Sequence, residues 1–337
     1  MLEIQPFVAI GALAFVTAGL VSYVLSHVAV RIGWRTHKLH LPGPGRIHDS
    51  PVVRFGGIAI LPAFLLALLF TSPDPESLIG ISLCSVLIAG IGLADDVWNI
   101  PPLGKLAGQC TVSVAAVLAG VQIAAVSNPF GGVIELDFAI GSLLTVFWLV
   151  GMMNAINLLD GLDGLAPGVV FVAALILSFL SAQLGNDALA LFGLALAGSV
   201  AGFLPLNVRK AKLILGDSGS NLLGFLIGVL AVLGQAKIGT ALLVLGIPIL
   251  DVGWAIVRRY RSGHGIMSRD TEHLHHRLLD AGLTRTQVTI VYVVLCASFG
   301  ASALFLERAE KLIALAVLIG LTAIMIYVGA KRAGTKR

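Results

Sequence analysis

The chain has 337 residues, of which 57% are hydrophobic and 12% are charged. Soluble domains carry about 25% charged residues, so this composition excludes an ordinary globular protein of the cytosol. The net charge is only +4, and we expect no nucleic-acid partner. In such a chain the placement of the basic residues says more than their sum.

Apolar runs long enough to cross a bilayer of about 30 Å recur from residue 6 almost to the C-terminus. They predict an all-α polytopic membrane protein with a single integral-membrane domain, residues 1–337. The first run is longer than the core of a signal peptide and is followed by Arg31 and Arg35, so we predict a retained first span with the N-terminus outside. Hydropathy predicts about eleven transmembrane helices, near residues 6–30, 56–71, 78–94, 103–125, 139–158, 166–184, 187–206, 218–235, 238–257, 286–305 and 311–330.

The basic residues support this topology. With the N-terminus outside, 19 of the 22 Lys and Arg residues fall in segments on the inner side, and only Lys237, Arg308 and Lys311 fall outside. The positive-inside rule describes this distribution, and it places the C-terminus and the predicted active-site loops in the cytoplasm. These loops lie near residues 31–55, 95–105, 157–168, 207–220 and 258–285.

Two adjacent carboxylates, Asp95 and Asp96, follow the apolar run of the third predicted span. Charged groups at such a position are costly and usually functional. Because adjacent acids repel, we expect a metal ion or the proton of a substrate to offset the pair. The alternative is a simple solvated helix end, although such an end more often carries Lys or Arg.

A second polar motif ends the fifth predicted span. Asn154, Asn157 and Asp160 are spaced by one helical turn each, so these side chains can line one face of an apolar helix. Asp163 follows, and the glycine after each aspartate allows close approach of a ligand to the backbone. The alternative is a set of polar contacts between helices beside a glycine turn.

The third motif, GDSGSN at residues 216–221, lies between Lys212 and another span. GDSG also surrounds the nucleophile of serine proteases, but nothing else in the chain supports that function. We expect Asp217 to be a hard oxygen ligand for Mg²⁺, and the amides at the start of the following helix to attract phosphate. The alternative is a helix N-cap made by Asp217 or Ser218.

The longest predicted inside loop combines arginines, among them Arg261, with three histidines, His273, His275 and His276. Together they form a dense cluster of hydrogen-bond donors for an anion. The H-x-H-H spacing could also hold Zn²⁺, although the sequence arranges no fourth ligand nearby. A basic loop that touches anionic lipid headgroups would explain the arginines but not the histidines.

Taken together, these residues predict a site for phosphate esters and Mg²⁺ at the membrane surface, where a soluble nucleotide meets a lipid phosphate. The motifs LADDVWNIPPLGK, NAINLLDGLDGLAPG, GDSGSNLLGF and HLHHRL, in this order and separation, resemble those of the polyprenyl-phosphate N-acetylhexosamine-1-phosphate transferases. The resemblance covers residues 31 to about 285. HLHH after RRYRSG resembles the bacterial undecaprenyl-phosphate GlcNAc-1-phosphate transferases, whereas the muramyl-pentapeptide branch has three consecutive histidines.

The resemblance implies a reaction in which a UDP-N-acetylhexosamine, with UDP-GlcNAc expected, and undecaprenyl phosphate give undecaprenyl-diphospho-GlcNAc and UMP. The product would start a cell-envelope glycopolymer. Mg²⁺ is the implied cofactor, with Mn²⁺ able to replace it. The family also implies a bacterial cytoplasmic membrane, contact with membrane lipid, and a homodimer, because relatives commonly dimerise.

Residue roles carry over by position in the motifs. Asp95 would deprotonate or position the lipid phosphate with the support of Asp96, and Lys105 would contact phosphate. Asp217 and Asn157 match the positions that contact the metal. The residues expected to bind substrate are Asn154, Asp160, Asp163 at the uracil position, and Arg261, His273, His275 and His276 in the loop that holds the nucleotide-sugar.

Two departures from the family pattern stand out. An aromatic residue on which uracil stacks in relatives is Ile214 here. The first cytoplasmic loop lacks the usual Asp-x-Pro, but Arg46, His48 and Arg54 are retained, as are Gly56 and Gly57.

Two other functions fit the sequence less well. The CDP-alcohol phosphotransferases need a DG-x₂-AR run with downstream aspartates, and the chain has no such run. A polyprenyl-phosphate carrier or ion-coupled transporter should bury its charges near the middle of the bilayer. The acids of this chain lie at the predicted cytoplasmic ends of spans, which favours an enzyme.

Overall fold

The computed structural model describes residues 4–36, 51–72, 78–128, 131–208, 210–234, 238–261 and 273–334. These parts of the chain form long helices, a few short ones and one small hairpin. In chain order they are α1 (Ile4–Arg35), α2 (Gly56–Thr71), α3 (Ile79–Trp98), α4 (Pro102–Leu118), β1 (Ala125–Ser127), β2 (Val133–Glu135), α5 (Phe138–Leu159), α6 (Leu165–Gln183), α7 (Asp187–Asn207), α8 (Gly216–Leu233), α9 (Ile238–Val244), α10 (Gly246–Arg261), α11 (Leu274–Asp280), α12 (Arg285–Ala303) and α13 (Arg308–Gly334).

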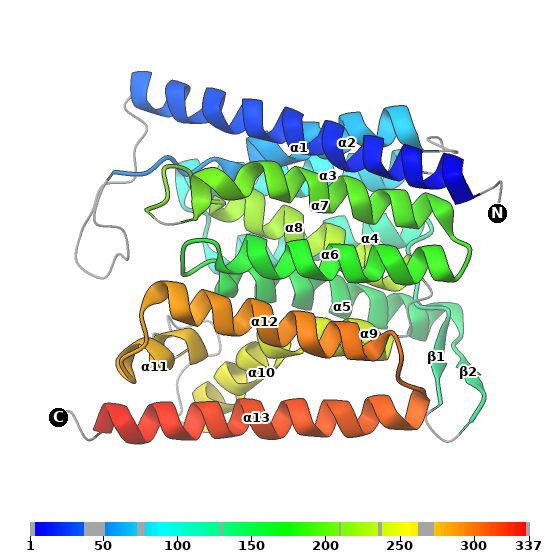
Figure 1. The fold of residues 1–337 in the computed structure, drawn as a ribbon, viewed down its shortest axis with the longest axis vertical. Helices are drawn as coiled ribbons and strands as arrows, with labels where there is room; N and C mark the ends of the chain where they lie inside the picture. Colours follow the sequence, from blue (N-terminus) through cyan, green and yellow to red (C-terminus); the bar gives the residue numbers. More distant parts are fainter. Residues whose placement is uncertain are drawn as a thin grey trace.

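The long helices lie side by side, and Figure 1 shows α1, α7, α6, α12 and α13 following one another across the molecule. α7 packs against both α1 and α6, and α6 also packs against α12. Within the described ranges, eight helices are long and apolar enough to cross a membrane. The helices α2 and α4 are apolar but shorter. The predicted all-α polytopic membrane protein is therefore confirmed, while the number of crossings stays a prediction.

Helix α8 forms the centre of the bundle. It packs against α2, α3, α5, α6, α7 and α9, and every residue from Gly216 to Ala231 is buried. A helix that is apolar on all sides is stable only inside a protein or a membrane. The polar residues at its N-terminus consequently have to find their partners within the protein.

The structure corrects the predicted span at 238–257, which is two helices. α9 ends at Val244 and α10 begins at Gly246. Pro248 has no N–H to donate to the preceding turn, so a continuous helix is disfavoured at this point. Gly246 and Pro248 together were a sequence signal for the break.

A small hairpin interrupts the helices between α4 and α5. β1 and β2 pair in antiparallel register, with Ala125 opposite Glu135 and Ser127 opposite Val133. The hairpin lies between the predicted spans 103–125 and 139–158, where no strand was predicted. Figure 1 shows this hairpin at the same end of the molecule as the N-terminus.

The predicted inner loops gather at the opposite end. Figure 1 shows the α5–α6 turn, the α7–α8 connection, the short helix α11 and the C-terminus at that end. Elements far apart in the sequence thus bring their polar ends together.

Glycines let α2 and α3 approach the N-terminus of α8. A Cβ added to Gly92 of α3 would lie 2.6 Å from the Ser218 Cα, and one added to Gly57 of α2 would lie 2.6 Å from the Ser218 carbonyl carbon. Real Cβ atoms essentially never come this close to other heavy atoms, so glycine is required at both positions. Gly90, two residues before Gly92, faces open space.

We predict that Gly92→Ala destabilises the protein and Gly90→Ala does not. The new methyl at position 92 must push α8 away from α3, and such overpacking costs about 1–3 kcal/mol. At position 90 alanine meets nothing and improves helix propensity by about 0.5–1 kcal/mol. Thermal unfolding in one detergent measures both variants, and equal midpoints for the two would contradict the close contact.

Candidate active site

The segment before α2 is held against the segment before α8. The Ile214 N–H donates to the Val53 carbonyl oxygen at 2.9 Å, and the Val53 N–H donates to the Lys212 carbonyl oxygen at 3.1 Å. These two bonds form an isolated parallel bridge between Val53 and Leu213. The next residue, Arg54, is therefore fixed beside the start of α8.

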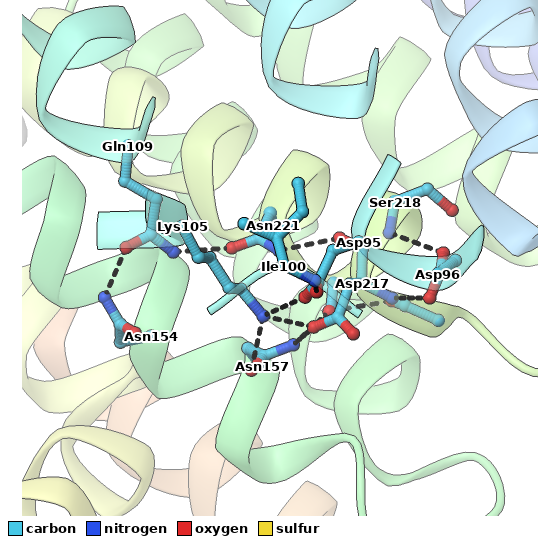
Figure 2. A network of polar contacts seen from close by, with 12 residues as sticks. Asp95, Asp96, Ile100, Lys105, Gln109, Asn154, Asn157, Asp217, Ser218 and Asn221 are labelled. Carbon is cyan, nitrogen blue, oxygen red and sulfur yellow. Dashed lines mark hydrogen bonds and ion pairs between the residues drawn. The ribbon is translucent and has the colours of Figure 1, made fainter. Parts of the chain in front are cut away.

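Asp96 satisfies the N-terminus of α8. Its side chain is fully buried, and its two oxygens accept the N–H groups of Asp217 at 2.8 Å and Ser218 at 3.0 Å (Figure 2). The Arg54 Nε lies 2.9 Å from the same carboxylate. The first N–H groups of a helix have no partner within it and attract negative charge. Asp96 therefore anchors α3 to the start of α8.

This contact corrects two predictions for the GDSGSN motif. The N-cap position is Leu215, and neither Asp217 nor Ser218 caps the helix. Two of the amides expected to attract phosphate, those of Asp217 and Ser218, already donate to Asp96, which leaves these two unavailable to a ligand. The partner comes from 121 residues away, so local spacing held no sign of it.

Asp95 and Asp96 have different partners. One of its oxygens accepts the Ile100 N–H at 2.7 Å, and the other lies 3.3 Å from the Lys105 Nζ. The expected repulsion between the two adjacent acids is thus relieved by different groups. Each carboxylate of the pair therefore has protein partners of its own.

Lys105 of α4 lies where three oxygens converge. Its Nζ contacts the Asp217 Oδ1, the Asn157 Oδ1 at 3.3 Å and the Asp95 Oδ2 at 3.3 Å (Figure 2). The Asn157 amide donates to the same Asp217 oxygen at 2.6 Å. The other Asp217 oxygen accepts from the Arg54 Nη2 at 2.5 Å. Asp217 therefore has a protein cation on each oxygen, and α3, α4, α5 and α8 meet at this cluster.

A network of amides adjoins the cluster. The Gln109 Nε2 donates to the Asn221 Oδ1 at 2.7 Å, and the Asn154 Nδ2 donates to the Gln109 Oε1 at 2.9 Å. The Asn221 Nδ2 donates to the Asp217 backbone carbonyl at 2.7 Å. Asn154, which we expected to bind substrate, thus takes part in this internal network. Sequence analysis missed Gln109 and Asn221, although an amide in an apolar run is itself a signal for contacts between helices.

The α5–α6 turn carries the two remaining acids. Burial, together with the nearby Asp217 carboxylate, raises the pKa of the Asp160 carboxyl well above its usual range. The Asp163 carboxylate accepts the Ala211 N–H at 3.0 Å, which ties this turn to the α7–α8 connection. Asp160 therefore borders the cluster, and Asp163 fixes the position of the turn.

Helix α11 brings its histidines to this turn. His275 is buried, and its Nε2 lies 2.7 Å from where a Cβ on Gly161 would be. Its ring stacks parallel to that of His273, with centroids 5.8 Å apart, and contacts that of His276 at 4.3 Å. Glycine at position 161 is what lets the imidazole approach this closely.

Arg261 ends α10 with an exposed side chain. The residues between it and His273 lie outside the described parts, as do Arg46 and His48. Within the described parts, no three His, Cys, Asp or Glu side chains are grouped to hold a metal. The zinc alternative for H-x-H-H gains no support from this arrangement.

Comparison with known proteins places this site in a family. Residues 78–235 match the model of glycosyl transferase family 4. A decaprenyl-phosphate N-acetylglucosaminephosphotransferase of Mycobacterium leprae is 35% identical over 333 residues, which cover 86% of this chain and 83% of the relative. An undecaprenyl-phosphate alpha-N-acetylglucosaminyl 1-phosphate transferase of Thermotoga maritima is 34% identical over 261 residues, 76% of this chain and 78% of the relative.

The chain belongs to glycosyl transferase family 4. The predicted resemblance to polyprenyl-phosphate N-acetylhexosamine-1-phosphate transferases is thereby confirmed. The part that matches the family model runs from α3 through α8 and so contains the carboxylate and lysine cluster. Arg54 and the histidine helix, which is α11 with His275 and His276, lie outside the matched residues.

We predict that Asp96→Asn destabilises this family 4 protein. An amide offers one acceptor oxygen in place of two, so a buried N–H of α8 loses its partner at a cost of about 1–3 kcal/mol. The matched control is Asp187→Asn, because Asp187 is an exposed acid in the first turn of α7. Surface changes of that kind stay within about 0.5 kcal/mol. Chemical unfolding of both variants tests the difference, and equal stability would show that Asp96 does not hold α8.

A second prediction concerns how the stability of the protein depends on pH below neutrality. Burial, with the neighbouring His276 and His273 and against the opposing effect of Asp251, lowers the pKa of His275 from 6.5 to about 3. The unfolded chain then binds a proton that the folded one resists, so stability is constant above about pH 6.5 and falls as the pH drops from there towards 3. The free energy of unfolding falls by at most about 1.4 kcal/mol per pH unit through this one group.

His275→Gln removes this titration. The drop in unfolding temperature between pH 7 and pH 5.5 should be smaller in the variant than in the unmodified protein. An identical drop in both proteins would contradict a buried neutral His275.

Proposed function

We propose that the chain transfers N-acetylglucosamine 1-phosphate from UDP-GlcNAc to a polyprenyl phosphate and releases UMP. The observation that carries this proposal is the convergence of the Asp95, Asn157 and Asp217 oxygens on Lys105 at one end of a membrane bundle. The relatives are named for transfer of this sugar phosphate to decaprenyl and undecaprenyl phosphate. Undecaprenyl phosphate is our proposed acceptor.

The oxygens around Lys105 suit a hard divalent cation. Two carboxylates and one amide oxygen lie around a single ammonium group, and Mg²⁺ is commonly held by one or two carboxylates together with substrate phosphates. Asp217 and Asn157 would hold Mg²⁺, and Mn²⁺ could replace it. Bound there, the ion would supply positive charge to the diphosphate of the nucleotide-sugar.

The protein's own cations would hold the phosphates. Lys105 offers a compact charge, while the planar fork of Arg54 matches the geometry of phosphate oxygens. The Arg54 side chain is 30% exposed, so it can reach a ligand without breaking the core. Sequence analysis named Arg54 only as a retained motif residue and missed its place in the site.

Asp95 is suited to receive the lipid phosphate. It would accept the last proton of that phosphate or orient it, and the phosphate oxygen would then attack the β-phosphorus of UDP-GlcNAc. A new oxygen–phosphorus bond forms as the bond between the β-phosphorus and the oxygen of UMP breaks. A positioned phosphate oxyanion is already a competent nucleophile, so no covalent phospho-enzyme is needed. Asp96 is buried with both oxygens engaged and would act by positioning α8.

The histidine helix would bind the nucleotide-sugar. His275 contacts the α5–α6 turn at Gly161, the residue after Asp160, and its ring contacts that of His276. Arg261 would bind the nucleotide-sugar from the end of α10. Asp163 would contact uracil if the turn opens its carboxylate to the ligand. The basic residues of the inner loops support a cytoplasmic location for this end of the bundle. We propose that the protein lies in a bacterial cytoplasmic membrane as a homodimer.

The test of this function is UMP release by the purified protein supplied with UDP-GlcNAc, undecaprenyl phosphate and Mg²⁺. We expect one UMP for each lipid diphospho-sugar formed. UDP-GalNAc in a parallel reaction checks the sugar. A polyprenyl-phosphate carrier or transporter would release no UMP, and that result would overturn the proposal.

We predict that Asp217→Asn reduces turnover to near zero while the protein still inserts and folds. The cation site would lose its charged ligand, and the two protein cations would lose their shared partner. Asp187→Asn serves again as the control, with unchanged turnover expected. Near-normal Mg²⁺-dependent activity in Asp217→Asn would remove this aspartate from the site.

A further inference from the structure

A buried acid outside the described cluster joins α10 to α11. Asp251 is 4% exposed and lies in the first half of α10, among apolar residues that precede its basic last turn. Its Oδ1 accepts the Leu274 backbone N–H at 2.9 Å, and its Oδ2 lies 3.5 Å from the His273 Nδ1. Placing a carboxylate inside a protein is costly, so it indicates a role that an apolar residue could not fill.

Helix α11 depends on contacts of this kind. It has seven residues, and its N-cap residue, His273, makes no side-chain capping bond. Isolated helices shorter than about 12 residues are marginal in water, so tertiary contacts must order this one. The Asp251 carboxylate supplies the missing acceptor at the start of α11, and a bond with a charged acceptor is stronger than a neutral one.

Two stacked histidines connect Asp251 to the candidate active site. The ring of His273 beside Asp251 stacks on that of His275. The His275 Nε2 faces Gly161, the residue after Asp160. One side of this stack is therefore fixed by Asp251 and the other side meets the turn that borders the carboxylate cluster.

We propose that Asp251 is a positioning residue, which holds α11 so that the buried His275 stays against Gly161 and the partly exposed His276 lies beside the bound nucleotide-sugar. This inference rests on the proposed function, because it assigns the histidine helix to the UDP-sugar. Asp251 itself touches neither the reacting phosphates nor the cluster around Lys105. Its loss should therefore weaken binding of UDP-GlcNAc more than it slows the chemical step.

The experiment compares Asp251→Ala and Asp251→Asn in the full-length protein. Asparagine keeps one oxygen that can accept the Leu274 N–H, while alanine keeps none. The control is Thr145→Val, because the Thr145 Oγ1 is another buried side-chain acceptor, bonded to the Ile123 N–H at 2.9 Å and remote from the cluster. Hydrogen–deuterium exchange of residues 274–280 reads the order of α11, and steady-state UMP release gives KM and kcat.

In Asp251→Ala we expect faster exchange in residues 274–280 with unchanged exchange in α8. The KM for UDP-GlcNAc should rise about 10-fold, the loss typical of one charge-assisted contact, while kcat falls less than about threefold. Asp251→Asn should lie between this variant and the unmodified protein. Thr145→Val should leave KM and the exchange of α11 unchanged.

Unchanged exchange of α11 in Asp251→Ala would overturn the anchoring role. Faster exchange with unchanged KM would overturn the link to the nucleotide-sugar, and a large loss of kcat at constant KM would assign Asp251 to the chemistry instead. The exchange measurement needs no substrate. Failure of the proposed function, seen as no UMP release by the unmodified protein, is thus distinguished from failure of the anchor.

Discussion

The buried N-terminus of α8 is the constraint on which the site depends. Backbone N–H groups that are buried must find partners within the protein, because an unpaired buried N–H is costly. The Asp96 carboxylate satisfies two of them, and Gly57 and Gly92 allow α2 and α3 to come close enough for this contact. With α8 fixed in this way, Asp217 has one position, opposite Lys105 and Arg54.

The charges of this cluster are nearly, but not fully, balanced. Three carboxylates, those of Asp95, Asp96 and Asp217, meet two cations, Arg54 and Lys105. Low effective dielectric strengthens each pair and makes an unpaired charge costly. The remaining negative charge favours one more cation, and the phosphates of two substrates would then bring further negative charge to the same place. The site is therefore suited to bring a metal ion and phosphates together.

The sequence was most informative where a residue type is energetically costly in an apolar segment. Acids in apolar runs are expensive, so Asp95 and Asp217 stood out; helical spacing singled out Asn157, and the family motifs added Lys105. The pairings between them were not readable, because Asp96 and the α8 amides are 121 residues apart and their contact depends on packing at Gly92. Asp251, Gln109 and Asn221 carried the same signal in apolar runs and were overlooked. The division of α9 from α10 was readable at Pro248, whereas the β1–β2 hairpin left only a weak turn signal.

Direct binding of Mn²⁺ tests the central claim that the oxygens around Lys105 form a cation site for phosphoglycosyl transfer. Electron paramagnetic resonance counts free and bound Mn²⁺ in the presence of UDP-GlcNAc. The account predicts one bound ion per chain in the unmodified protein and in His276→Ala, and none in Asp217→Asn at the same concentrations. Binding that is unchanged in Asp217→Asn, or lost in His276→Ala instead, would place the metal elsewhere and contradict the account.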